Sequence, residues 1–408
     1  MKKVQTESSA AFWQNFAEVP SRLSIANITT GFVAAVFGCT GPALIVINSG
    51  MVGGLSQHQI VSWLFGIYFF GGLIGVAMAL AFRQPICGAF TIPGAVLLGS
   101  SLTYFNLSQA VGAYLVTGVL ILVLGLSGIM DHIMQRVPLA IVMATIAGVM
   151  LKFALGIVLA IKSAPIVGGL ALAGYFLLPK VWPRVPPVLG AIILGVCGAL
   201  VSGKVQAMAW NGAFYLPQLV WPEFSPGAIL AISIPLTLLV LGSENAQGIG
   251  VLLGAGYQPP INFMTVVSGV GTIVAALFGA HSANIAGVMT AICATQDNIA
   301  KEDRYGAAVV NGVLFMLFGL FAGAAVQLIK VLPGFLISLL AGLAMVPVLI
   351  GAMHQGFSGR KFKLSTFAAF VIALSEISLF KISAPFWALL GGLLIALTVE
   401  KKDFQVKE

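Results

Sequence analysis

Apolar segments follow one another almost without interruption from Ile25 to residue 400, and only short polar, proline- or glycine-containing stretches separate them. A helix that crosses a bilayer needs about 20 predominantly apolar residues, and most of these segments approach that length. The pattern therefore predicts an all-α polytopic membrane protein with fourteen transmembrane segments, or twelve if the shortest segments are re-entrant or fused. The candidate spans lie near 24–48, 60–82, 86–103, 109–130, 138–161, 166–180, 187–203, 227–254, 261–279, 283–295, 307–329, 334–352, 364–380 and 384–400.

Composition agrees with this pattern and excludes several classes of protein. The chain of 408 residues is 59% hydrophobic and only 8% charged, whereas a soluble domain has about 45–50% apolar and about 25% charged residues. A cytosolic enzyme, a nucleic-acid binder and a disordered chain are therefore not expected. The cysteines stand singly in apolar segments, which predicts buried structural thiols and neither a disulfide framework nor a zinc site; they are Cys39, Cys87, Cys197 and Cys293.

The basic residues predict the orientation. If the N-terminus is cytoplasmic and fourteen spans alternate, 15 of the 20 Lys and Arg residues lie on the inner side and 5 on the outer side. This bias follows the positive-inside rule and predicts that both termini are cytoplasmic. The first 20 residues are polar, so we expect no signal peptide.

The chain divides into two related halves of seven spans. The polar-aromatic stretch 204–226 separates them on the outside. Residues 38–46 resemble 242–250 in their small residues, and residues 88–95 resemble 279–286, at equivalent spans of the two halves. Because seven is an odd number, the second half must have the opposite topology, which is typical of inverted-repeat transporters.

Spans 3 and 10 are short and interrupted near their starts. Pro93 suits the first turn of a helix, and Ser282 and Asn284 are good N-caps for a helical run over residues 285–292. We expect an extended stretch followed by a half-helix in each span, with the two N-termini facing each other near the bilayer midplane. Two such N-termini would form an anion site without Lys or Arg. The alternative is a pair of kinked packing helices without a ligand.

Glu244 is the acid predicted to lie deepest in the membrane. An ionised group there costs on the order of 3 kcal/mol unless it is paired, and small residues around it allow other backbone to approach. Burial favours the neutral carboxyl, so Glu244 could exchange a proton; alternatively, it is permanently protonated and structural. His281 could relay a proton or be a hydrogen-bonded structural residue. No motif for a metal, a cofactor or a catalytic nucleophile is present, so we expect no enzyme.

Three motifs resemble the benzoate/proton symporter family of bacterial inner membranes. They are Ser243-Glu244-Asn245-Ala246-Gln247-Gly248, Thr91-Ile92-Pro93-Gly94-Ala95 and Asn284-Ile285-Ala286-Gly287-Val288-Met289-Thr290-Ala291-Ile292-Cys293. That family is similar in fold to uracil permeases, anion exchangers and sulfate-permease-like carriers.

The resemblance implies a 7+7 inverted repeat with a core domain that moves against a gate domain in an elevator mechanism, often in a homodimer. The implied boundaries are a cytoplasmic tail 1–21, core 22–131, gate 132–203, external linker 204–226, core 227–330, gate 331–400 and a cytoplasmic tail 401–408.

Two positions bear on the substrate. Glu244 and Gln247 stand where the family usually has glutamine and proline. Glu244 matches a glutamate that nucleobase permeases use, but Ala283 stands where those permeases have a second acid. We therefore predict a proton-coupled symporter of a small organic anion, most simply benzoate or a similar aromatic carboxylate. The alternatives are a nucleobase or inorganic-anion carrier and an uncoupled anion channel.

The expected site lies between spans 3, 8 and 10. Its proton-coupling candidates are Glu244 and His281, and the substrate's ring would rest on Phe90 and Ile92. The substrate-binding candidates are Phe90, Thr91, Ile92, Pro93, Gly94, Ala95, Glu244, Asn245, Gln247, Ser282, Ala283, Asn284, Ile285 and Ala286.

Overall fold

The computed structural model describes residues 13–128, 138–183, 187–204, 216–294, 299–330, 332–375, 377, 379 and 384–404. This part of the chain is mostly helical. Counted over the described residues alone, four helical stretches are long and apolar enough to cross a membrane, namely Ile25–Val52, Gln57–Phe82, Leu107–Ser127 and Pro226–Leu253. Most of the other apolar helices are shorter, but Leu139–Ser163 has 25 residues and Gly334–Phe357 has 24.

The elements of the first half follow in this order: α2 (Ile25–Val52), α3 (Gln57–Phe82), β1 (Gly88–Ala89), α4 (Ile92–Ser101), α5 (Leu107–Ser127), α7 (Leu139–Ser163), α8 (Pro165–Val181) and α9 (Pro187–Val201). Polar caps define several of these helices. Ser56 with Gln59, and Asn106 with Gln109, form capping boxes at the starts of α3 and α5; such reciprocal bonds satisfy backbone donors that have no partner within the helix.

The second half contains one long composite helix and several shorter elements. They are α10 (Pro226–Ala228), η1 (Ile229–Ser233), α11 (Ile234–Leu239), η2 (Val240–Asn245), α12 (Ala246–Gly254), α13 (Ile261–Ala276), β2 (Asn284–Ile285), α14 (Gly287–Ala294), η3 (Lys301–Asp303), α15 (Tyr305–Leu320), α16 (Ala322–Lys330), α17 (Gly334–Phe357), α18 (Lys363–Leu374), α19 (Ala384–Thr398) and η4 (Lys401–Phe404).

Three details differ from the sequence interpretation. Cys197 is exposed on α9, although the sequence predicts that all four cysteines are buried, because its side chain lies on the outer face of this peripheral helix. The apolar run 307–329 is divided at Phe321 into α15 and α16. Ser282 and Asn284 do not cap a helix over 285–292, because Asn284 and Ile285 form strand β2 and α14 begins only at Gly287. The backbone of Asn284 pairs with that of Ala89, and this pairing holds it in an extended conformation.

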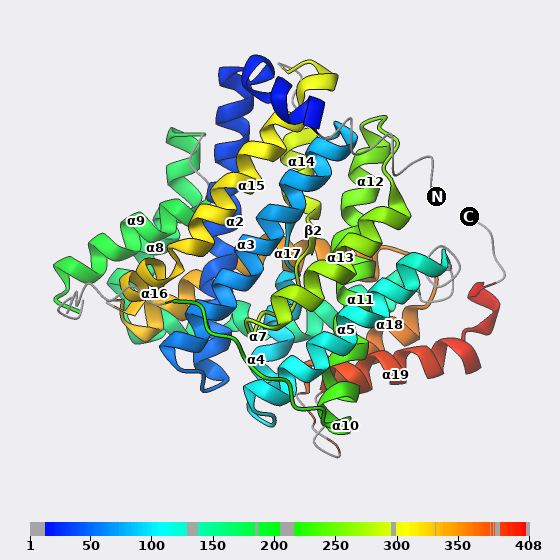
Figure 1. Cartoon of the computed structure of the whole chain (residues 1–408). Helices are drawn as coiled ribbons and strands as arrows, with labels where there is room; N and C mark the ends of the chain where they lie inside the picture. Colours follow the sequence, from blue (N-terminus) through cyan, green and yellow to red (C-terminus); the bar gives the residue numbers. More distant parts are fainter. Residues whose placement is uncertain are drawn as a thin grey trace.

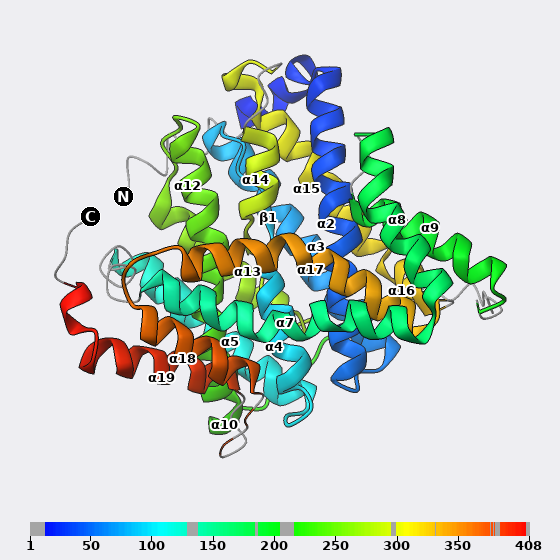
Figure 2. The same cartoon turned by 180° about the vertical axis from the view of Figure 1, so that it is seen from behind.

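The helices form a central group flanked by two peripheral pairs. Helix α15 packs against α2 and α3, and α13 packs against α5. Helices α8 and α9 project on one side of this group, and α18 and α19 lie on the opposite side (Figure 1). Helices α7 and α17 pack side by side across the face seen in Figure 2. The largest buried apolar cluster includes residues of α2, α3, α4, α5, α13, α14 and α15, and a smaller one joins α8 and α9 to α17.

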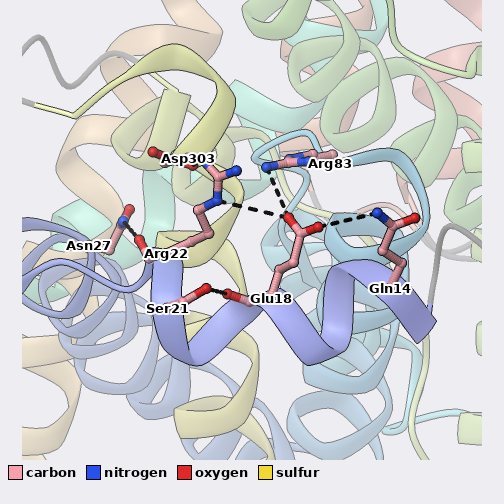
Figure 3. A network of polar contacts seen from close by, with 7 residues as sticks. All are labelled: Gln14, Glu18, Ser21, Arg22, Asn27, Arg83 and Asp303. Atoms are coloured by element: carbon pink, nitrogen blue, oxygen red, sulfur yellow. Dashed lines mark hydrogen bonds and ion pairs between the residues drawn. The ribbon is translucent and has the colours of Figure 1, made fainter.

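A polar network ties the helical residues 13–22 to the central group. Glu18 contacts Arg83 at 3.4 Å and Arg22 at 3.8 Å, and Arg22 reaches Asp303 at 3.5 Å (Figure 3). Asn15 Nδ2 donates to the Leu80 carbonyl at 2.7 Å. Exposed ion pairs contribute about 0–1 kcal/mol each, so the network serves mainly to position this segment at the end of α3.

Candidate functional site

A short antiparallel pairing brings together two segments from opposite halves of the chain. Gly88 pairs with Ile285 and Ala89 with Asn284, through strands β1 and β2. Helix α3 runs directly behind β1. A Cβ atom on Gly88 would lie 2.2 Å from the Gly71 carbonyl oxygen and 2.7 Å from the Gly75 nitrogen. Only glycine allows the backbone of β1 to approach the helix so closely.

Helix α4 begins immediately after β1, and its first turn leaves one backbone donor available. Thr91 is the N-cap, and its Oγ1 accepts from the Gly94 N–H at 3.3 Å. Pro93 has no N–H, and the Ala95 N–H donates to the Thr91 carbonyl. The Ile92 N–H is therefore the donor of this first turn that remains for a partner outside the helix.

Helix α14 begins in a similar way after β2. The Ala286 N–H donates to the Cys87 carbonyl at 2.8 Å, which ties the segment before α14 to the segment before β1. The next donor, the Gly287 N–H, points to Glu244 Oε2 at 3.4 Å. The Gln247 side chain lies over Gly287, because a Cβ atom there would be 2.2 Å from Gln247 Oε1.

The Glu244 carboxylate lies between the starts of both short helices. It accepts from the Gly287 N–H at 3.4 Å, and it lies close enough to the Ile92 N–H to interact with it. Only 8% of Glu244 is exposed. Its position in the π-helical turn η2 is of a kind that is frequent at functional sites. Helix N-termini carry partial positive charge, so a carboxylate lies where an anion is stabilised without a basic side chain.

Further buried polar atoms lie on the residue after Glu244 and on the neighbouring elements α13 and β2. Asn245 Oδ1 accepts from the Ser268 hydroxyl at 3.2 Å, and Ser268 Oγ also accepts from the Ile285 N–H at 3.3 Å. Among the residues that the structure describes, Asn245 Nδ2 and Asn284 Oδ1 have no hydrogen-bond partner. An unsatisfied buried polar atom costs about 1–3 kcal/mol, so a ligand or water that reached them would gain stabilisation.

His281 joins α3 to the start of α4. The Trp63 indole N–H donates to His281 Nδ1 at 2.8 Å, and His281 Nε2 lies 2.8 Å from the Thr91 carbonyl oxygen. Indole can only donate and a carbonyl can only accept, which assigns a neutral ring with the proton on Nε2. Both nitrogens are thereby satisfied. This geometry favours the structural interpretation of His281 over that of a proton relay.

Substitution Trp63→Phe is expected to destabilise the protein by about 1–3 kcal/mol, because it leaves a buried ring nitrogen without its donor. The measurement is denaturant unfolding of the purified protein. In a double-mutant cycle with His281→Ala, the combined loss should be clearly smaller than the sum of the two single losses. Additive losses would contradict a stabilising bond between these side chains.

The remaining candidate residues lie around the junction formed by β1, β2 and the starts of α4 and α14, where they make different contacts. Ser282 Oγ accepts from the Thr91 N–H at 3.0 Å, and the Ala283 N–H donates to Thr272 Oγ1 at 3.4 Å. Phe90 is buried between the rings of Tyr68 and His281. Ala95 and Ala286 are buried as well. The structure therefore brings Glu244 to Ile92 and the Gln247 side chain to the start of α14, whereas Phe90 and Ala283 pack against other elements.

Sequence reasoning missed Gly287, Ser268 and Trp63 as parts of this site. Gly287 stands inside the third of the family motifs, but nothing in its spacing shows that its N–H faces Glu244. Ser268 and Trp63 belong to ordinary apolar segments. Their involvement depends on helix packing, and a single sequence carries no signal for it.

The cavity beside Pro93, in the first turn of α4, is small. Pro93 and Leu97 line a cavity of about 20 Å³ together with residues of α7, α11 and α19, including Thr145, Pro235 and Leu389. That volume holds about one water molecule. An aromatic acid does not fit there unless α4 and α11 separate from α7 and α19.

Comparison with known proteins adds independent evidence. The benzoate membrane transport protein family matches residues 21–398. The chain is 30% identical to the inner membrane protein YdcO of Escherichia coli (strain K12) over 90% of this chain and 94% of that one. It is 26% identical to the benzoate membrane transport protein of Acinetobacter baylyi over 91% and 94% of the two chains.

Solved structures share the fold at low sequence identity. The transmembrane domain of a cyanobacterial bicarbonate transporter, BicA, superposes with a TM-score of 0.62 at 16% identity and covers 92% of this chain and 98% of that one. The murine anion transporter Slc26a9 in its inward-facing state superposes with a TM-score of 0.60 at 13% identity, covering 97% and 71%.

Proposed function

This chain belongs to the benzoate membrane transport protein family, and we propose that it is a proton-coupled symporter of a small organic anion, most simply benzoate or a similar aromatic carboxylate. The Acinetobacter baylyi relative is named for benzoate, and the relatives of similar fold are named as carriers of bicarbonate and other anions. These names support a membrane anion transporter. An inner-membrane location is supported by the Escherichia coli relative.

The contact of Glu244 with both helix starts carries this proposal. The Ile92 and Gly287 N–H groups are the donors that an anionic substrate would need. The Glu244 carboxylate accepts from the Gly287 N–H and lies beside the Ile92 N–H. An ionised Glu244 and a substrate carboxylate cannot share these donors. Both negative charges would then lie within hydrogen-bond distance of the same N–H groups, and at low dielectric they would repel each other strongly.

Protonation resolves this conflict. A neutral Glu244 releases the two backbone donors to the substrate carboxylate and can itself donate a hydrogen bond to it. The substrate and the proton then favour each other's binding by the same free energy. In this mechanism Glu244 carries the coupled proton. When it is ionised, its own carboxylate takes the position that the substrate carboxylate would have at the two helix starts.

The proposed transport cycle moves a core domain against a gate domain. We assign residues 22–131 and 227–330 to the core and 132–203 and 331–400 to the gate, as two inverted halves of seven spans each. Helices α4 and α14 would be the half-helices of spans 3 and 10. The small cavity between α4 and α11 of the core and α7 and α19 of the gate supports a motion that opens this interface to admit the ring. We include assembly as a homodimer in this proposal.

Binding measurements at several pH values test the proposal. Because binding takes up a proton, the affinity for benzoate should fall about tenfold per pH unit where the empty protein has Glu244 ionised. Isothermal titration in buffers of different ionisation enthalpy should report the uptake of about one proton per benzoate. Uracil, xanthine, bicarbonate and sulfate serve as competitors.

The outcome separates the alternatives. Displacement of benzoate by uracil or sulfate at lower concentration than benzoate itself would indicate a nucleobase or inorganic-anion carrier. Affinity that is independent of pH, together with a reversal potential that ignores a pH gradient, would contradict proton coupling and indicate an uncoupled channel.

A further inference from the structure

Two cysteines from opposite halves of the chain meet in the interior. The Cys87 thiol contacts the sulfur of Cys293 at 3.6 Å, across a sequence separation of 206 residues. Both residues are free thiols and neither is exposed. Cys87 directly precedes strand β1, and Cys293 is the penultimate residue of α14. The contact therefore joins the residue before β1, which leads to α4, to the end of α14.

The surrounding backbone holds the two thiols in place. The Cys87 N–H donates to Thr290 Oγ1 at 3.1 Å, and the Cys87 carbonyl accepts from the Ala286 N–H at 2.8 Å. Thr290 and Ala286 lie in α14 and immediately before it. Cys87 is thus bonded to the residue before this helix and to the middle of the helix, so small side-chain movements rather than a rearrangement of the chain would bring the sulfurs together.

We propose that Cys87 and Cys293 form a reversible disulfide that responds to oxidants and restrains α14. A disulfide bond is about 2.05 Å long, so the sulfurs must approach by about 1.5 Å from their present contact. The oxidant is a peroxide such as hydrogen peroxide. The proposal goes beyond the transport function and does not depend on the identity of the substrate.

The chemistry balances with peroxide as the only oxidant. One sulfur, as its thiolate, attacks a peroxide oxygen; the O–O bond breaks, and the released hydroxide takes up the proton that the thiol lost and leaves as water, which gives a sulfenic acid. The second sulfur attacks the sulfenic sulfur, the S–O bond breaks, and a second water leaves with the remaining thiol proton. The two sulfurs lose two electrons in total, which reduce one peroxide to two waters. A dithiol reverses the bond by exchange.

Burial makes this reaction depend on local opening. Peroxide reaches the pair only when α14 and the segment before β1 separate. Once formed, the disulfide would hold the end of α14 to that segment, while the pairing of β1 with β2 already holds its start. Opening of α14 would then be suppressed until the bond is reduced.

Mass spectrometry of the full chain tests the bond directly. The chain carrying Cys39→Ala and Cys197→Ala retains only the proposed pair; Cys197 is exposed on α9 and Cys39 is half-buried on α2. After peroxide treatment in lipid nanodiscs, remaining thiols are labelled with N-ethylmaleimide in denaturant. We expect an unlabelled chain that lacks two hydrogens and a peptide that joins Cys87 to Cys293, with full labelling restored by dithiothreitol.

Hydrogen exchange tests the consequence for α14. In the oxidised protein, amides of residues 287–294 should exchange at least tenfold more slowly than in the reduced protein. The variants Cys87→Ser and Cys293→Ser are the matched controls, and their exchange should not respond to peroxide.

Several results would overturn the proposal. One is full labelling of Cys87 and Cys293 after a peroxide dose that does link the cysteines of the denatured chain. Another is oxidation of these cysteines to sulfinic acid without formation of a disulfide. An unchanged exchange rate in a fully bonded chain would refute the restraint of α14, and a response of the serine variants would show that other residues cause it. The mass measurement on the unsubstituted chain needs no variant, so it remains decisive if a variant fails to fold.

Discussion

Substitution Glu244→Gln is expected to abolish proton-driven accumulation of substrate while leaving exchange of substrate across the membrane intact. Glutamine has nearly the same shape as protonated glutamate and leaves the Ile92 and Gly287 N–H groups to the substrate, but it carries no proton from one side to the other. With one coupled proton, the unsubstituted protein should accumulate substrate about tenfold per unit of pH difference. The variant should reach a ratio of about one.

Uptake of labelled benzoate by proteoliposomes under an imposed pH gradient measures this ratio, and counterflow without a gradient measures exchange. Glu223→Gln is a matched control, since Glu223 accepts hydrogen bonds from Asn106 and Gln109 away from the junction. Accumulation by the Glu244→Gln variant at the level of the unsubstituted protein would refute Glu244 as the coupling group. Loss of both accumulation and counterflow with a folded protein would indicate that the ionised carboxylate itself is needed for binding.

Substitution Gly88→Ala is expected to destabilise the protein by about 3 kcal/mol or more. Overpacking a filled interior costs about 1–3 kcal/mol where side chains can adjust. Here the added methyl group would meet backbone atoms of α3, the nearest at 2.2 Å, and backbone within a packed helix cannot move aside alone. The expected results are a much lower yield of monodisperse protein and a lower midpoint of thermal unfolding.

Gly250→Ala is the matched control for this change. No atom lies within 4 Å of a Cβ added at Gly250, and alanine is the better helix former by about 1 kcal/mol. The control should be as stable as the unsubstituted protein or more stable. Equal stability of the two alanine variants would show that β1 and α3 can move apart at little cost.

The membrane character and the family could be predicted from the sequence. Long apolar segments with few charges exclude a soluble fold by composition alone, and the motifs around Glu244, Pro93 and Asn284 identify the family, as the match over residues 21–398 confirms. These inferences depend on residue type and order along the chain, which a single sequence contains in full.

The details of helix starts could be predicted only in part. Proline and threonine near residue 92 are local signals, because the N-cap bond from Gly94 to Thr91 closes within a few residues. The local pattern places the start of α14 too early, since Asn284 and Ile285 pair with β1 from the other half of the chain. Local capping preferences do not include such a distant partner.

By itself, the sequence determined that this is a helical membrane protein of a transporter family and that Glu244 is an acid in an apolar segment. Tertiary structure alone decided that the Glu244 carboxylate meets the Ile92 and Gly287 N–H groups, that Trp63 and Thr91 satisfy both nitrogens of His281, and that Cys87 meets Cys293. The reason is physical: each of these contacts joins residues far apart in the chain, and their distances are set by how several helices pack against one another.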